Sequence, residues 1–138
     1  MGKKLTPNKK FIFTDAYVYM INDKNKYDVI ILDVYSSVHS IPINFVTTDF
    51  LTMIKKHLAE GGIMIANIIT SPTFNNKFSK RVDNTIKHVF RENLSRQIIG
   101  DFSPFSDELS NVIYTYYDRP ADNKIFTADK NSAMYGQY

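Results

Sequence analysis

The amino-acid sequence predicts an α/β fold, in which strands and helices alternate along the chain. Two runs, YDVIILDVY from Tyr27 and IMIANII from Ile63, are rich in β-branched residues and lack period-two alternation. Such runs are typical of strands that are buried on both faces. From Thr47, between the two runs, apolar residues recur at helical spacing. Because strands joined by right-handed crossovers run parallel, this order predicts a mostly parallel sheet with helices on both faces.

The remaining elements follow from the same patterns. FIFTD, residues 11–15, indicates a first strand, and Gly61-Gly62 is expected to end the helix after Thr47 through a left-handed cap. A second long helix is expected from Phe78 to Phe90, where the apolar residues keep a helical stripe. The other expected elements are a short helix in AYVYMINDKN and a closing pair of strands, RQIIGDF and NVIYTYYD, with an antiparallel C-terminal strand.

Composition limits the chain to a few classes of protein. Its 138 residues, of which 43% are hydrophobic, suit one domain with its own core. There is no cysteine, which excludes disulfides and thiolate metal sites and favours a cytoplasmic location. No run approaches the roughly 20 apolar residues that a membrane span requires, so no membrane association is expected. A net charge of +3 is too small to indicate a dedicated nucleic-acid binder.

Polar side chains mark the ends of three expected strands. Asp15, Asp33 and Asn67 each stand near the carboxyl end of a strand, and ligands of open α/β sheets bind outside that edge. The alternative for each aspartate is a local role as a turn former or a helix cap. Two carboxylates at corresponding places on consecutive strands favour a site over two separate local roles.

Other sets of reactive residues are less informative. Ser36, Ser37, His39 and Asp33 have the side chains of a hydrolase triad, but the sequence lacks the Gly-x-Ser-x-Gly elbow. Gly61-Gly62 is expected to end a helix instead of opening one, so no phosphate-binding glycine loop is found.

The histidines and the cationic residues are expected on solvated surfaces. None of the three histidines has metal-ligand spacing, and His57 and His88 are expected on solvated helix faces. One face of the second long helix is basic, with Lys77, Lys80, Arg81, Lys87, His88 and Arg91. Solvation explains this face most simply, and nucleic-acid binding is the less favoured alternative.

Three blocks of the sequence, in order, resemble one enzyme family. FTDAYVYM, YDVIILDVYSSVHSIP and TTDFLTMIKKHLAEGGIMIANI are similar to segments of spermidine synthases, the polyamine aminopropyltransferases. The resemblance runs from about Phe11 to about Tyr117. It implies an S-adenosylmethionine-methyltransferase-like, Rossmann-like sheet that is N-terminally truncated, because the family's opening strands and glycine-rich loop are not found. The regions it implies are a basic N-terminal arm over 1–10, a partial Rossmann domain over 11–118 and a polar C-terminal tail over 119–138.

The resemblance also implies roles for individual residues. Asp15 and Ala16 match the acid and the small residue that contact the adenine of decarboxylated S-adenosylmethionine or methylthioadenosine. Asp33 matches the catalytic carboxylate that orients and deprotonates the attacking amine, since an ammonium ion cannot attack a sulfonium. The family's polyamine-binding loop falls on Tyr35, Ser36 and Ser37, with Ser36 in place of a second acid. No metal is implied.

These inferences predict a spermidine synthase-like transferase that, as a fragment, is inactive alone. It would transfer an aminopropyl group from decarboxylated S-adenosylmethionine to a polyamine. One alternative with the same fold is an S-adenosylmethionine-dependent methyltransferase relative. Another, outside the enzymes, is a non-catalytic interaction module.

The truncation also predicts an assembly. In the family, the strands that are not found here lie between the strand ending at Asp15 and the strand ending at Asp33. The Tyr27–Asp33 strand is therefore expected to have an unpaired edge, and such edges template pairing with another chain. A homodimer is expected, and the alternative is direct pairing of the 11–15 strand with this edge inside one chain.

Overall fold

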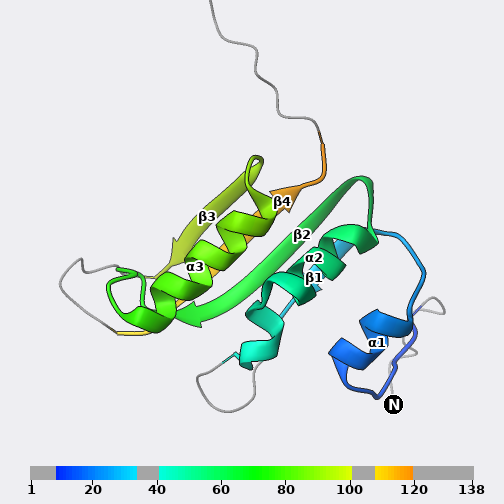
Figure 1. The fold of residues 1–138 in the computed structure, drawn as a ribbon, viewed down its shortest axis with the longest axis horizontal. Coiled ribbons are helices and arrows are strands. Elements are labelled where there is room, and N and C mark those ends of the chain that lie inside the picture. The colour runs from blue at the N-terminus through cyan, green and yellow to red at the C-terminus, as the bar shows by residue number, and fades with distance from the viewer. Residues whose placement is uncertain (1–8, 34–40, 101–107, 120–138) are drawn as a thin grey trace, which may run out of the picture.

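The computed structural model describes residues 9–33, 41–100 and 108–119 and shows a four-stranded sheet with helices packed against it (Figure 1). In chain order, its elements are α1 (Ala16–Asn22), β1 (Tyr27–Leu32), the 3-10 helix η1 (Ile43–Val46), α2 (Thr48–His57), β2 (Leu58–Thr70), α3 (Lys77–Phe90), β3 (Leu94–Ile99) and β4 (Ser110–Tyr117). The predicted N-terminal arm before Lys9 and the predicted C-terminal tail beyond Arg119 lie outside the described residues.

The sheet has the strand order β1-β2-β4-β3 and mixes parallel with antiparallel pairing. β1 runs parallel to β2, with Leu32 beside Ala66. β4 runs antiparallel to both β2 and β3. The predicted α/β fold, with a sheet that closes in antiparallel pairing at its C-terminal end, is confirmed.

One face of the sheet carries the core. Along β2, the side chains of Met64, Ala66 and Ile68 point to this face and are almost fully buried. α2 and α3 lie side by side across the same face (Figure 1). The helical residues that fill the space between them and the sheet are Phe50, Leu51, Ile54, Val82, Ile86 and Phe90. The helical stripes predicted for these two segments are therefore the surfaces that pack on the sheet.

The opposite face of the sheet is open in the part of the chain that the structure describes. On β1, the side chains of Val29 and Ile31 are 50% and 66% exposed. The prediction of helices on both faces is wrong for these residues, because α2 and α3 cover the same face (Figure 1). Apolar residues on both sides of a strand are typical of a strand that is buried on both faces. Each face is buried, however, only where another element packs on it.

The FIFTD segment, predicted as a strand, is not one. Phe11, Ile12 and Phe13 are exposed, and the chain stays irregular until α1 begins after Asp15. A strand is stabilised by ladder hydrogen bonds to a neighbour, and this segment pairs with no strand of the described sheet. The parallel part of the sheet therefore consists of β1 and β2, and β1 forms an edge.

The glycine pair lies inside a strand and not at a helix end. α2 ends at His57, and β2 begins at the next residue. Gly61 has a left-handed φ of 74°, and its N–H donates to the carbonyl oxygen of Asp118 at 2.8 Å. A Cβ on Gly62 would lie 2.8 Å from the carbonyl oxygen of Ala59. The two glycines thus let β2 bend beside the end of β4, and the predicted helix cap is wrong.

His57 connects α2 to the turn after α1. Its ring is half-buried, with Nδ1 2.8 Å from the carbonyl oxygen of Met53 and Nε2 3.0 Å from that of Asp23. The predicted solvated position is wrong for His57 and is confirmed for His88, which is exposed on α3. The contact with Asp23 holds the C-terminal end of α1 against α2.

Candidate functional site

Two of the three predicted strand-end residues meet at the carboxyl edge of the parallel strands. Asp33 follows β1 and Asn67 lies in β2, and they are neighbours because Leu32 pairs with Ala66. The Nδ2 of Asn67 donates to Oδ1 of Asp33 at 3.1 Å. Asp33 is exposed. Its carboxylate is therefore oriented by an amide and remains accessible to a ligand.

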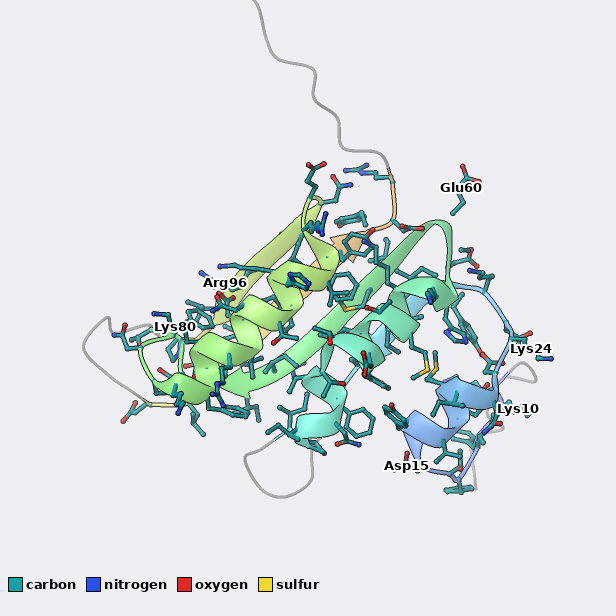
Figure 2. All side chains as sticks on the ribbon, viewed as in Figure 1. Lys10, Asp15, Lys24, Glu60, Lys80 and Arg96 are labelled. Carbon is teal, nitrogen blue, oxygen red and sulfur yellow. The ribbon has the colours of Figure 1, made fainter. Side chains whose placement is uncertain are left out.

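Asp15 begins α1 and caps it (Figure 2). Its Oδ1 accepts from the backbone N–H groups of Tyr17, at 2.8 Å, and Val18, at 3.1 Å. The local capping role, which the sequence left open for this aspartate, is therefore observed. Because residues 11–15 form no strand of the described sheet, Asp15 is not a strand-end residue as Asp33 is, and the expected pair of strand-end carboxylates is not observed.

A groove of about 390 Å³ runs between the N-terminal segment and β1. Ala16 lines it together with Ile12, Met20 and Ile30. Most of the groove wall is apolar, which suits an aromatic ring or an added strand better than a charged group. Ala16 is therefore placed beside a recess, while Asp33 lies beyond the residues that line it.

A hydrogen-bonded chain of Tyr19, Tyr27 and Asp23 lies beside the groove, and its two tyrosines line the groove wall. The Oη of Tyr27 donates to Oδ2 of Asp23 at 2.7 Å and lies 3.1 Å from Oη of Tyr19. The hydrogen bonds to Tyr19 and Asp23 raise the pKa of Tyr27, and the bond from Tyr27 lowers the pKa of Asp23. Sequence reasoning missed this chain, because no spacing rule shows that tyrosines on α1 and β1 meet.

A larger groove, of about 540 Å³, lies between α3 and the segment where η1 meets α2. Val46, Phe78 and Arg81 are among the residues that line it, and the predicted site residues that the structure describes, Asp15, Ala16 and Asp33, are not. The six basic residues of the α3 face are exposed, as predicted. Volume alone therefore does not identify a site, and the polar side chains that meet at a strand end, Asp33 and Asn67, lie away from this groove.

Part of the predicted site lies outside the described residues. Tyr35, Ser36 and Ser37, and with them His39, fall in residues 34–40. Within 9–33, 41–100 and 108–119, no three metal-ligating side chains gather into a metal site. No helix in those ranges is long and apolar enough to cross a membrane.

One sequence family matches most of the chain. The family described as "Spermine/spermidine synthase domain" matches residues 3–99. The chain belongs to the spermine/spermidine synthase family. The match includes Asp15, Ala16, Asp33 and the whole of α2, β2 and α3. The resemblance of the three sequence blocks to spermidine synthases is therefore confirmed.

Curated relatives of this family are aminopropyltransferases. The chain is 32% identical over 76 residues to a probable polyamine aminopropyl transferase of Bifidobacterium longum, covering 55% of this chain and 17% of that protein. It is 28% identical over 86 residues to a polyamine aminopropyltransferase of Sulfurisphaera tokodaii, covering 62% and 28%. The chain therefore spans less than a third of the length of these relatives.

The fold is that of the spermidine synthases. A crystal structure of spermidine synthase in complex with the transition state analogue AdoDATO superposes with a TM-score of 0.63 at 17% identity. The superposition covers 96% of this chain and 49% of that one. Nearly all of the chain thus has a counterpart in about half of that structure.

Proposed function

We propose that the chain provides part of an aminopropyltransfer site, which binds an adenosine-type nucleoside and a polyamine. The observation that carries this proposal is the exposed Asp33 carboxylate, oriented by Asn67 at the carboxyl edge of β1 in a chain of the spermine/spermidine synthase family. Ligands of α/β sheets bind outside this edge. We also propose that the protein is cytoplasmic, as its sequence predicts.

Asp33 acts in this proposal on the acceptor amine. The amine nitrogen forms a bond to the aminopropyl carbon of decarboxylated S-adenosylmethionine as the carbon–sulfur bond breaks, which leaves neutral methylthioadenosine. The nitrogen must first lose a proton, because an ammonium ion has no free electron pair. A carboxylate that is held by an amide and open to solvent suits both tasks, since it attracts the cationic polyamine and accepts its proton.

Asp15 and Ala16 contact the nucleoside in this proposal. Both capping bonds of Asp15 go to Oδ1, so Oδ2 can accept from the exocyclic N–H of adenine. Ala16 lines the groove beside β1, where its small side chain leaves space for the ring. The spermidine synthase structure in complex with AdoDATO supports a ligand of this class.

Asp15→Ser tests the nucleoside contact without removing the helix cap, because serine caps helices about as well as aspartate. We expect methylthioadenosine binding, measured by isothermal titration calorimetry, to weaken by roughly tenfold or more, since a hydrogen bond to a charged group is lost. Asp28→Asn, on an exposed residue of β1, is the matched control and should leave the affinity unchanged. Unchanged affinity in Asp15→Ser would refute the adenine contact.

Asp33→Asn should leave the fold intact. Because Asp33 is exposed and its hydrogen bond to Asn67 lies at the edge of the sheet, we expect the free energy of unfolding to change by less than about 1 kcal/mol. Thermal denaturation of the two proteins measures this difference. A loss of several kcal/mol would mean that Asp33 has a structural role instead of the proposed role in ligand binding.

Calorimetric titrations with methylthioadenosine, S-adenosylmethionine and decarboxylated S-adenosylmethionine separate the alternative functions. Tighter binding of S-adenosylmethionine than of its decarboxylated form would favour a methyltransferase relative. If none of these three nucleosides binds, an interaction module would be favoured. The sequence contains no glycine-rich loop to hold the rest of the nucleoside. We therefore also propose that the chain is inactive alone. We also propose that the chain forms a homodimer, as its sequence predicts.

A further inference from the structure

The edge of β1 is open on the side away from β2. The described sheet ends at β1, so its outer N–H and C=O groups have no strand beside them. Val29 and Ile31 are exposed on the open face of the same strand. Natural proteins shield such an edge, because an apolar strand with unpaired backbone groups pairs readily with another segment.

The same chain contains a strand-forming segment that has no partner. Phe11 is 64% exposed and Phe13 is 98% exposed, although aromatic residues are among the best strand formers. This segment stands across the groove from β1, and Ile12 and Thr14 line the groove wall that faces Ile30. An unpaired edge and an unpaired strand former thus occur together in one chain.

We propose that two copies of the chain exchange these segments, so that Phe11–Thr14 of each copy forms a strand parallel to β1 of the other. The register that aligns the two strand-end aspartates sets Phe11 beside Val29 and Phe13 beside Ile31. These four exposed side chains then share the open face of the sheet. Pairs of aromatic and β-branched residues across neighbouring strands are favourable.

The anchoring of α1 explains why the pairing forms between chains. Tyr17 stacks on Phe50 of α2, with ring centroids 5.6 Å apart, and His57 holds the carbonyl oxygen of Asp23. α1 is thus fixed at both ends, which keeps the preceding segment away from its own β1.

The expected size of the interface is sufficient for a stable dimer. The exchange is reciprocal, so it has the twofold symmetry of most homodimers. A fully exposed aromatic side chain buries roughly 150 to 250 Å², and in each copy Phe13 is 98% exposed and Phe11 is 64% exposed. Together with the β1 residues that they cover, they reach the roughly 1,200 Å² at which specific interfaces begin.

The exchange also completes the candidate site, and this part rests on the proposed function. Parallel pairing in the stated register places Asp15 of the partner subunit beside Asp33, at the carboxyl edge of one sheet. The two carboxylates, which do not meet within one chain, then border the same site. Each site would take its nucleoside-binding carboxylate from one copy and its amine-binding carboxylate from the other.

Light scattering of the full chain tests the exchange without any ligand. We expect a species of twice 16.0 kDa at micromolar concentration. Phe13→Lys should weaken the dimer by at least roughly 100-fold, because one buried aromatic anchor is lost from each copy. Ile43→Lys introduces the same charge at a residue of η1 that is 72% exposed and should leave the dimer intact. A monodisperse species of 16.0 kDa for the unmodified chain would overturn the proposal.

Introduced cysteines test which segments pair, because the chain has none of its own. Phe13→Cys in one copy mixed with Ile31→Cys in another should give a disulfide-linked dimer on mild oxidation. The matched mixture of Phe13→Cys with Ile99→Cys, on the opposite edge strand β3, should not. Efficient linking of Ile31→Cys to itself, with no mixed product, would show antiparallel pairing of two β1 edges and would overturn the exchange. None of these outcomes depends on nucleoside binding, so they stand apart from the test of the proposed function.

Discussion

Phe50→Ala is expected to lower the free energy of unfolding by about 3 to 5 kcal/mol, the usual cost of truncating a buried phenylalanine. Phe50 is 1% exposed, between α2 and the sheet. Its ring meets that of Phe45 edge-on, with centroids 4.9 Å apart, and Tyr17 of α1 stacks on it. The variant should therefore also loosen α1, the helix that begins at Asp15. Urea denaturation measures the loss of stability.

Phe78→Ala is the matched control for this prediction. The side chain of Phe78 is 41% exposed on α3, so its removal should cost less than about 1 kcal/mol. Equal losses in the two variants would contradict the assignment of the core to the space between α2, α3 and the sheet.

Asp83→Asn is expected to have the second largest effect, a loss of about 2 to 3 kcal/mol. Asp83 is nearly buried on α3, and its Oδ1 accepts from Oη of Tyr114 at 2.8 Å and from Arg96 at 2.6 Å. Lys87 lies 2.7 Å from its other oxygen. Hydrogen bonds to buried charged groups contribute more than neutral ones. Arg96 reaches this carboxylate from β3 (Figure 2), so the cluster ties α3 to the far strands of the sheet.

The cluster also gives this effect a pH dependence. Burial acts to raise the pKa of Asp83, but the bonds from Lys87, Arg96 and Tyr114 outweigh it and lower the pKa below its ordinary value of 3.8. The unfolded chain then binds the proton more tightly, so the stabilisation is full above about pH 4 and is lost as the pH falls further. We expect the difference in stability between the unmodified chain and Asp83→Asn to shrink between pH 7 and pH 3.

Lys87→Gln provides the control for Asp83. The Lys87 side chain is half exposed, so the loss should stay below about 1 kcal/mol. A pH-independent difference between Asp83→Asn and the unmodified chain would show that the variant acts through packing and not through the charge.

The long elements were predictable because each has a pattern that local chemistry enforces. Val82, Ile86 and Phe90 of the predicted apolar stripe form the buried face of α3, although Phe78 at its start is exposed, and the IMIANII run lies within β2. The errors occur where a residue pattern is compatible with two structures. FIFTD has strand-type residues but no neighbour in the sheet, and the glycine pair suits a strand bend as well as a helix cap.

The candidate site was predictable in part for the same reason. A polar residue at the end of a buried strand is visible in the sequence, and Asp33 and Asn67 do meet at the sheet edge. The separation of Asp15 from that edge was not visible, because it depends on how α1 is held against α2. The contact between Tyr19 and Tyr27 joins two elements whose packing no local pattern specifies.

The most direct test of nucleoside binding at the sheet edge is a titration of the isotope-labelled chain with methylthioadenosine, followed by backbone amide resonances in NMR spectra. We expect saturable shifts concentrated at Asp15, Ala16 and Asp33, with Asn67 affected through its hydrogen bond to Asp33. The larger groove beside Val46 and Arg81 should stay unperturbed. Shifts confined to that groove, or no shifts at millimolar nucleoside, would contradict nucleoside binding at the edge of β1.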